Sequence, residues 1–341
     1  MKLLTSRNAL RASALIGLAL ALQAFAGPAE DDFQRRATAA GVVRAMGFDT
    51  AADVNNHVLG DGKFPPSGSG YDTAVHASGP GSIRFTVPSL SPANTSGAWR
   101  INFTDDLSVL FGQNQEFYVQ WRQRFDNAML SNAFAGADGW KTIIIGEGDT
   151  APSGDVGSCS ELELVVFNGN MAGFPRMYHN CGVYAGFYES YGAYDFKIQN
   201  AMPSPFCLYS DHSYAGCFKF YANEWMTFQI HVKMGPLGTA LSTLENKQVT
   251  GFTNSLIELW VAREGQPSKL VISWPGAVLH ESSGAKYGKV WLLPYNTNKN
   301  PTLSYPIANT WYDELIISTN KIADPGIVSI RPRPPTGTAA H

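Results

Sequence analysis

Beyond its first 26 residues, the sequence has no apolar run long enough to cross a membrane. It also has no long segment with the 3.6-residue period of an amphipathic helix, no heptads and no internal repeat. These absences argue against a helical membrane protein, a coiled coil and a repeat array. The net charge is only -3, which gives no reason to expect nucleic acid as a partner.

The first residues have the organisation of an export signal. Three basic residues precede an apolar run from Ala12 to Leu22, and Ala24 and Ala26 form a small-x-small cleavage site. We therefore expect an exported protein, periplasmic or extracellular, that begins near Gly27 and is a monomer. About 315 residues remain, enough for one large all-β domain. The expected organisation is a signal peptide (1–26), a lead-in segment (27–70), a single domain (71–325) and a Pro-rich tail (326–341).

The sequence has four cysteines, which in an exported chain predict two disulfides. Three pairings satisfy this count. We favour Cys159–Cys181 and Cys207–Cys217, because each closes a short loop around a Gly-, Ser- or Asn-rich insertion. The alternative is a zinc site made by all four thiolates, but the chain contains no CxxC pair to support it.

Short segments rich in β-branched and aromatic residues, separated by turn signals, run through the rest of the chain. The predicted strands are Ser82–Val87, Ala98–Phe103, Glu116–Phe125, Lys141–Gly146, Glu161–Asn168, Gly182–Tyr188, Trp225–Met234, Ser255–Arg263, Lys269–Ser273, Val290–Leu293 and Trp311–Ser318. This pattern predicts an all-β protein, an antiparallel sandwich of two sheets, in preference to an α/β fold.

Three of these segments alternate apolar residues with an unusually polar second face. They are Phe117–Phe125, Thr227–Lys233 and Ser160–Phe167. A period of two places alternate side chains on opposite faces of a sheet. The polar faces carry Tyr118, Gln120, Arg122, Arg124, Gln229, His231, Lys233, Glu161 and Glu163. Such a face predicts a groove for a polar polymer.

Three segments of the chain resemble the concanavalin A-like, or laminin G-like, jelly roll, especially its polysaccharide lyase branch. They are FYVQWRQRF in Phe117–Phe125, NEWMTFQIHVKMG followed by SLIELWVAREG in Asn223–Gly265, and TWYDELIISTNKIADP in Thr310–Pro325. The resemblance implies a jelly-roll sandwich with long loops, which the expected disulfides would staple, and a secreted carbohydrate-active protein. The QIH triplet at Gln229–His231 also occurs in one alginate lyase family, but the other motifs of that family are missing here.

A lyase that acts on a uronate polysaccharide must neutralise a carboxylate, remove the neighbouring proton and protonate the leaving oxygen. Histidine and tyrosine suit the proton transfers, and arginine or amide donors suit the carboxylate. We expect His231 as the base, Tyr118 as the acid and Arg122 as the main carboxylate ligand. Further substrate-binding candidates are Gln120, Arg124, Lys141, Glu161, Glu163, Gln229 and His179.

Other interpretations remain open from the sequence. Glu161 and Glu163 could serve a glycoside hydrolase, or pair with Arg122 and Arg124 across neighbouring strands. A non-catalytic glycan-binding or adhesion module would need only the polar groove and the dense set of aromatic residues in the loop-rich interval 148–220. No cofactor or catalytic metal is expected, apart from a structural calcium that Asp49 and Asp313 could hold.

Overall fold

A computed structural model describes residues 28–57, 69–93, 95–132, 134, 139–149, 157–169, 173–179, 199–202, 216–242, 247–296 and 298–326. The expected signal peptide, the tail beyond 326 and the predicted strand Gly182–Tyr188 lie outside these residues. No helix in the described ranges is long and apolar enough to span a membrane.

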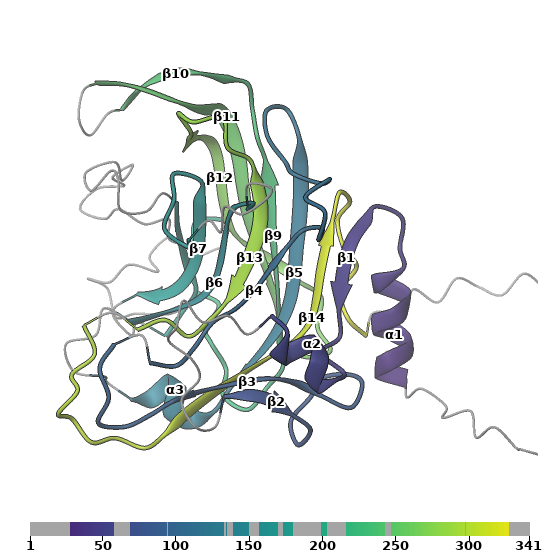
Figure 1. Ribbon diagram of the computed structural model, residues 1–341, viewed down its shortest axis with the longest axis vertical. Helices are drawn as coiled ribbons and strands as arrows, with labels where there is room; N and C mark the ends of the chain where they lie inside the picture. The colour runs from purple at the N-terminus through teal and green to yellow at the C-terminus, as the bar shows by residue number, and fades with distance from the viewer. Residues whose placement is uncertain are drawn as a thin grey trace, which may run out of the picture.

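Two antiparallel sheets form the molecule (Figure 1). The larger sheet has the order β10-β11-β9-β5-β14-β3-β2, with β1 also paired to β14 and β12 to β11. Its strands are β1 (Val42–Met46), β2 (Gly70–Asp72), β3 (Ser82–Val87), β5 (Glu116–Phe125), β9 (Met226–Lys233), β10 (Leu237–Ser242), β11 (Lys247–Ala262), β12 (Lys269–His280) and β14 (Ala308–Ser318).

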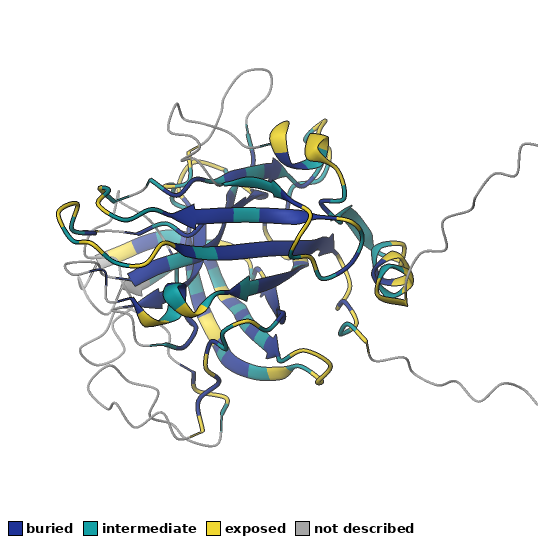
Figure 2. Ribbon diagram, turned by 90° about the horizontal axis from the view of Figure 1, so that it is seen from below, coloured by how far each residue is buried: buried dark blue, intermediate teal, exposed yellow. Residues whose placement is uncertain are grey.

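The smaller sheet has the order β4-β13-β6-β7-β8. Its strands are β4 (Trp99–Asn102), β6 (Gly139–Glu147), β7 (Glu163–Gly169), β8 (Arg176–His179) and β13 (Tyr287–Leu292). Among the described residues, three helices accompany the sheets: α1 (Pro28–Ala37), α2 (Ala51–Asn55) and α3 (Asn127–Ser131). In Figure 1, α1 lies beside β1 at one side of the molecule. Figure 2 shows that much of this helix is exposed, whereas the strands are mostly buried.

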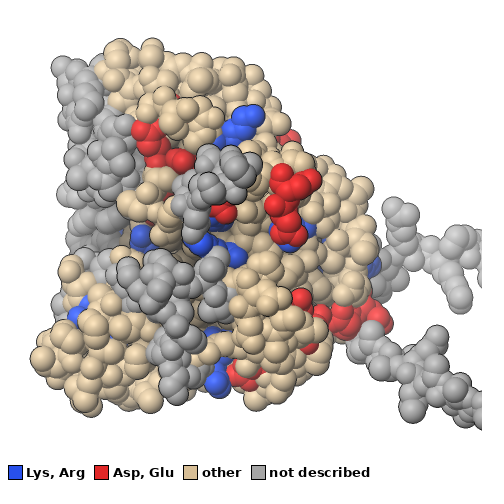
Figure 3. Space-filling view, in the orientation of Figure 1, with Lys and Arg blue, Asp and Glu red and all other residues tan. Residues whose placement is uncertain are grey.

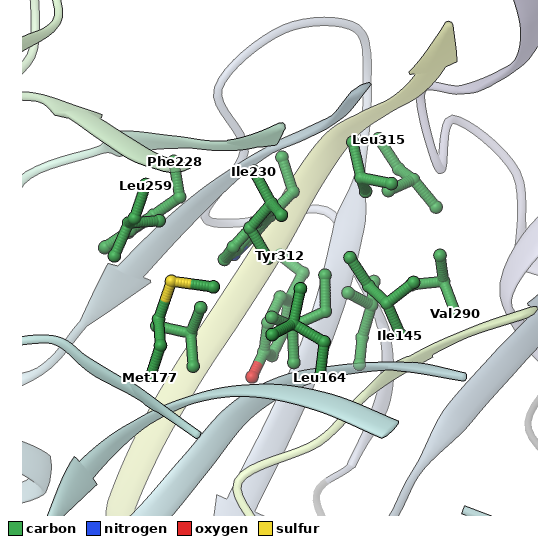
Figure 4. Close-up of a cluster of buried hydrophobic side chains, with 14 of the residues drawn as sticks. Ile145, Leu164, Met177, Phe228, Ile230, Leu259, Val290, Tyr312 and Leu315 are labelled. Carbon is green, nitrogen blue, oxygen red and sulfur yellow. The ribbon is translucent and has the colours of Figure 1, made fainter. Parts of the chain in front are cut away.

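The core fills the space between the sheets with aliphatic and aromatic side chains, as their alternation requires. Figure 4 shows Ile145 and Leu164 of the smaller sheet facing Ile230 and Leu315 of the larger one. Tyr312 also crosses this core, and its hydroxyl donates to the carbonyl oxygen of Thr142 at 2.7 Å. This bond joins β14 to β6 in the middle of the sandwich.

The predicted all-β sandwich of two antiparallel sheets is confirmed. The alternation did not predict β1, β2, β8 and β10, because they are short or lack a clear apolar face. Residues expected to form a lead-in segment supply β1, which pairs with β14 and so belongs to the larger sheet. The stapled loops stay a prediction. Cys159 and Cys217 are both disulfide-bonded, but Cys181 and Cys207 lie outside the described residues.

Candidate active site

The outer face of the larger sheet carries six of the predicted site residues, the sixth being Arg124 near the end of β5. β5 and β9 are antiparallel neighbours, with Tyr118 opposite His231 and Gln120 opposite Gln229. Arg122 follows on the same face of β5, opposite Thr227. The alternation in the sequence therefore predicted correctly that these side chains share one face.

The end of the described chain and helix α1 cover much of this face. Gln120 accepts a hydrogen bond from Arg36 Nη1 at 2.8 Å and donates one to the carbonyl oxygen of Ala323 at 3.1 Å. Gln229 donates to Ile322 O and accepts from Ile322 N, at 3.2 and 2.8 Å. Both amides are buried. They hold two segments of the chain against the sheet instead of presenting donors to a ligand.

Arg122 is engaged by carboxylates, but not by the ones expected from the sequence. Its Nη1 lies 3.3 Å from Glu314 Oε1, and its Nη2 lies 3.4 Å from Glu264 Oε1. The expected partners Glu161 and Glu163 are not on a neighbouring strand, because Glu163 begins β7 in the smaller sheet. That expected pairing is wrong. Arg124 lies two residues further along β5, opposite Trp311 of β14.

His231 lies between two carboxylates. Its Nδ1 is 2.9 Å from Glu258 Oε2, its Nε2 is 3.2 Å from Glu116 Oε2, and its ring stacks on Tyr118 with centroids 4.2 Å apart. Both ring nitrogens are therefore occupied, and two anionic groups surround the imidazole. A polyanionic chain would meet repulsion here. This surrounding disfavours His231 as the base of a uronate lyase.

The outer face of the smaller sheet carries a second group of ionisable residues. Strand register places Trp291, Ile144, Val165 and Tyr178 in one row across β13, β6, β7 and β8. Trp291, Ile144 and Val165 belong to a separate hydrophobic cluster, distinct from the core between the sheets, and Tyr178 packs against it. The row forms an apolar floor beneath Lys141.

Lys141 extends over this floor toward Glu163 and Tyr178. Its Nζ lies 3.6 Å from Glu163 Oε1, and the Tyr178 hydroxyl donates to the same oxygen at 3.3 Å. The ammonium group is also 5.6 Å from the ring centre of Tyr178 and 4.8 Å from that of Tyr295. A lysine amine and a tyrosine hydroxyl thus share one carboxylate oxygen.

Burial drives both charged members of this group toward their neutral forms. Desolvation raises the pKa of Glu163 to about 7, although Lys141 and Tyr178 oppose the shift. Desolvation also lowers the pKa of Lys141, against the attraction of the Glu163 carboxylate. A buried lysine with a lowered pKa is a stronger candidate for a general base than an exposed one.

Further basic and aromatic side chains lie on the same face. Arg176 shares the outer face of β8 with Tyr178, and Lys289 shares that of β13 with Trp291, over which its Nζ lies at 5.2 Å. In the space-filling view, basic and acidic groups lie close together near the centre of the face shown (Figure 3). The sequence prediction missed these residues, apart from Lys141 and Glu163. Their common signal is a charged residue inside an apolar strand, as in YGKVWL.

The remaining predicted residues lie apart from this group. Both carboxylate oxygens of Glu161 accept from the Ser282 hydroxyl, at 2.6 and 2.9 Å, and one lies 3.6 Å from His280 Nδ1. His179 is buried with its ring 4.8 Å from that of Trp274. Glu161 and Glu163 therefore have different partners and do not form a facing pair.

The two residues predicted to bind calcium, Asp49 and Asp313, have different surroundings in the structure. Asp313 is buried, and its Oδ2 already accepts from the N–H groups of Ala77 and Ser78 at 2.7 and 3.2 Å. Beside the same loop, a Cβ on Gly79 would lie 1.7 Å from Asp49 Oδ1 and 3.1 Å from Glu30 Oε2. Within the described residues, neither of these two buried oxygens has a hydrogen-bond partner.

Asp49 Oδ1 and Glu30 Oε2 are carboxylate oxygens, the type of ligand that calcium prefers. No group of three or more His, Cys, Asp or Glu in the described part of the chain is arranged to hold a metal. Calcium, however, also accepts backbone carbonyl and water oxygens, so two carboxylates can form the core of a site. Asp49 and Glu30 would hold the ion. Asp313 would support the neighbouring loop that contains Gly79, because it accepts from the N–H groups of Ala77 and Ser78. Burial and the neighbouring carboxylates of Glu30, Asp53 and Glu314 raise the pKa of Asp49 to about 6.

Fold and surface together define an antiparallel β-sandwich with a lysine–glutamate–tyrosine group on the outer face of its smaller sheet. No protein-family model matches the chain, and no curated protein matches it. Among solved structures, it is similar to a PL-14 alginate lyase from Aplysia kurodai (TM-score 0.49, 13% identity, covering 82% of this chain and 100% of that one).

Two further structures show the same kind of similarity. An endo-β-1,4-glucuronan lyase from Trichoderma reesei has a TM-score of 0.43 at 11% identity, covering 76% of this chain and 89% of its own. The catalytic domain of a glycoside hydrolase family 131 protein from Coprinopsis cinerea has 0.39 at 12%, covering 83% and 96%. The binding domain of a botulinum neurotoxin is similar as well, with a TM-score of 0.34 at 11% identity, covering 76% of this chain and 46% of its own.

Proposed function

We propose that this protein is a polysaccharide lyase that cleaves a uronate-containing glycan by β-elimination at Lys141. The observation that carries the proposal is the partly buried amine of Lys141, held beside the hydroxyl of Tyr178 on an apolar and aromatic floor. Elimination needs a base and an acid on neighbouring atoms of the same sugar. Lys141 and Tyr178 supply that pair.

In this mechanism the neutral amine of Lys141 removes the C5 proton, and the Tyr178 hydroxyl protonates the leaving O4. Each proton transfer contributes roughly 10²–10⁴-fold to the rate. Arg176 and Lys289 lie on the same face; both are buried and Lys289 is ion-paired with Asp149, so they would act on the C6 carboxylate through the positive charge they add beneath the site, not by direct contact. Tyr295, which is only partly buried, offers an aromatic ring on which a sugar ring can lie. Secretion of the protein is part of the same proposal.

The outer face of the larger sheet supports this chemistry less well. His231 is surrounded by Glu116 and Glu258, and the amides of Gln120 and Gln229 are used by the chain itself. Hydrolysis by Glu161 and Glu163 is also less well supported, since the two carboxylates have different partners. We therefore assign the role of the base to Lys141 instead of His231, and the role of the acid to Tyr178 instead of Tyr118.

The test is to incubate the purified protein with a panel of uronate polymers and follow the ultraviolet absorbance of an unsaturated uronate. We expect Lys141→Gln and Tyr178→Phe each to lower the rate by at least roughly 10²-fold. His231→Gln should leave it within about twofold. Loss of activity in His231→Gln with retention in Lys141→Gln would return the site to the larger sheet. Binding to one polymer without any absorbance change would identify a glycan-binding module instead.

A further inference from the structure

Glu163 is the member of this group that the proposed elimination does not yet use. It is fully buried, with a side-chain exposure of 0%, in the first position of β7. Its Oε1 is the atom that both Lys141 Nζ and the Tyr178 hydroxyl approach, at 3.6 and 3.3 Å. Within the described residues its Oε2 has no hydrogen-bond partner. A buried carboxyl group in this position requires an explanation, because burial without full compensation is costly.

An ion pair alone explains the arrangement poorly. The 3.6 Å separation is longer than a charge-assisted hydrogen bond, and Oε2 accepts no hydrogen bond from any residue that the structure describes. The groups that influence the pKa of Glu163 are Lys141 of β6 and Tyr178 of β8, and Glu163 in turn influences Tyr287 of β13. Lys289 of β13 lies on the same face, because Gly146 pairs with both Glu163 and Lys289, but it forms an ion pair with Asp149. Lys141 is therefore the cation that pairs with Glu163. In these surroundings a carboxyl group that is neutral for part of the time is more stable than one that is always ionised.

We propose that Glu163 is a positioning residue that returns the proton from the base to the acid, so that Lys141 and Tyr178 are reset together after each elimination. This inference rests on the proposed function of Lys141 and Tyr178. The shared oxygen Oε1 is the physical basis, because it lies between the two groups that must exchange a proton.

The steps balance as follows. With Lys141 neutral, Glu163 protonated and Tyr178 protonated, the amine takes the C5 proton, C4 and C5 become doubly bonded, and the C4–O4 bond breaks. Tyr178 gives its proton to O4 and becomes a phenolate. Glu163 then protonates the phenolate, and the Lys141 ammonium group reprotonates the Glu163 carboxylate. The enzyme returns to its starting state, and no proton from solvent is consumed.

Substitution of Glu163 by glutamine tests the relay, because glutamine keeps the shape but cannot pass on a proton. We expect Glu163→Gln to lower kcat by roughly 10²-fold with KM within about twofold. A small proton carrier such as imidazole should restore the rate in proportion to its concentration, since it replaces the missing relay. Glu147→Gln is the matched control: its carboxylate lies on β6 and accepts from the backbone N–H of Leu162. It should change neither kcat nor the buffer dependence.

A second measurement needs no substrate. In protein labelled with ¹³C at glutamate carboxyl groups, the Glu163 signal is assigned by its loss in Glu163→Gln. Its titration midpoint should rise in both Lys141→Met and Tyr178→Phe, because each removes a group that favours the carboxylate. An unchanged midpoint in both variants would show that the three groups are not coupled and would overturn the relay.

The activity measurements and the titration together distinguish a failure of the relay from a failure of the lyase function. If the wild type cleaves a polymer and Glu163→Gln does so equally fast without buffer dependence, the relay is wrong and the lyase function stands. If no polymer yields an unsaturated product, the lyase function fails and the relay fails with it. The titration then shows whether the three groups nevertheless share a proton.

Discussion

Lys141 stands in a strand whose other residues are almost all apolar. In GWKTIIIGE, Trp140, Ile143 and Ile145 face the core, and Ile144 lies on the opposite face. A lysine is rarely placed among such residues unless its charge is paired or its amine has a use. The register shift between Lys141 and Ile143 is a local irregularity in the pairing of β6 with β7. It turns the lysine outward while Trp140 keeps its place in the core.

Tyr312 offers a prediction about stability at the scale of one atom. Its hydroxyl donates to the Thr142 carbonyl inside the core, where Tyr312 is fully buried. We expect Tyr312→Phe to lower the free energy of unfolding by about 1–2 kcal/mol in urea titrations. Tyr71→Phe is the control, since the Tyr71 hydroxyl also donates to a backbone carbonyl but is only partly buried. An equal loss in both variants would contradict this account of the core bond.

The sequence could predict single residues at the site only in part. The alternation in β5 and β9 showed correctly that Tyr118, Gln120 and Gln229 share a face. It could not show that Ile322 and Ala323, more than 90 residues further along the chain, would occupy those amides. Hydrogen bonds to distant backbone atoms leave no periodic trace in a sequence. For the same reason Tyr178 looked like one aromatic among many.

At the scale of elements, helix α1 is held to the larger sheet by a buried group of charges. Arg36 is fully buried and bonds Asp32 of its own helix, Gln120 of β5 and Glu314 of β14. Glu314 adopts a positive φ of 50°, at the irregularity in β14 that lets its carboxylate reach both Arg36 and Arg122. A side chain rarely takes this conformation inside a strand unless its surroundings impose it.

Removal of one member of this group should be costly. We expect Arg36→Met to destabilise the protein by about 3 kcal/mol, because Glu314 would remain buried with only Arg122 to compensate it. Arg35→Met should cost less than about 1 kcal/mol, since the Arg35 side chain is half exposed. Chemical unfolding of both variants measures the difference. Similar values for the two would mean that α1 is not anchored by its buried arginine.

The carboxylates beside Gly79 give a prediction about a metal. If calcium binds Asp49 and Glu30, its addition should raise Tm and chelation should lower it, because the ion binds only the folded state. Glu30→Gln should reduce this response. Asp31→Asn, which changes an exposed carboxylate on the same helix, should not. A Tm that is the same with calcium and with chelator would exclude the ion.

The predicted strands differ from the observed ones mainly at their ends and in their partners. β7 begins at Glu163, whereas the prediction began at Glu161, and β12 extends to His280, beyond the predicted Ser273. The assignment of β7 to the smaller sheet decided where Glu163 would lie. Local alternation says which side chains share a face, but partner choice depends on the whole topology.

At the scale of the whole molecule, both sheets present a polar outer face, and only the structure distinguishes them. One is covered by α1 and by residues 320–326, and the other carries Lys141, Glu163 and Tyr178. The net charge of -3 says nothing of this difference, because both faces carry acidic and basic groups together. The strand pattern predicted the sandwich but not which outer face the chain itself would cover. The expected monomer stays a prediction.

The two ends of the described chain are fastened to each other: the N–H of Gly326 donates to Asp32 Oδ2 at 3.3 Å, four residues after α1 begins. A chain closed in this way should tolerate circular permutation. Joining Gly326 to Pro28 by a short flexible linker and opening the exposed turn between Gly265 and Gln266 should give a protein that melts cooperatively near the parent temperature. A protein opened at the same turn but without the linker should have a lower Tm, because the contact between Gly326 and Asp32 would then have to form between two separate fragments.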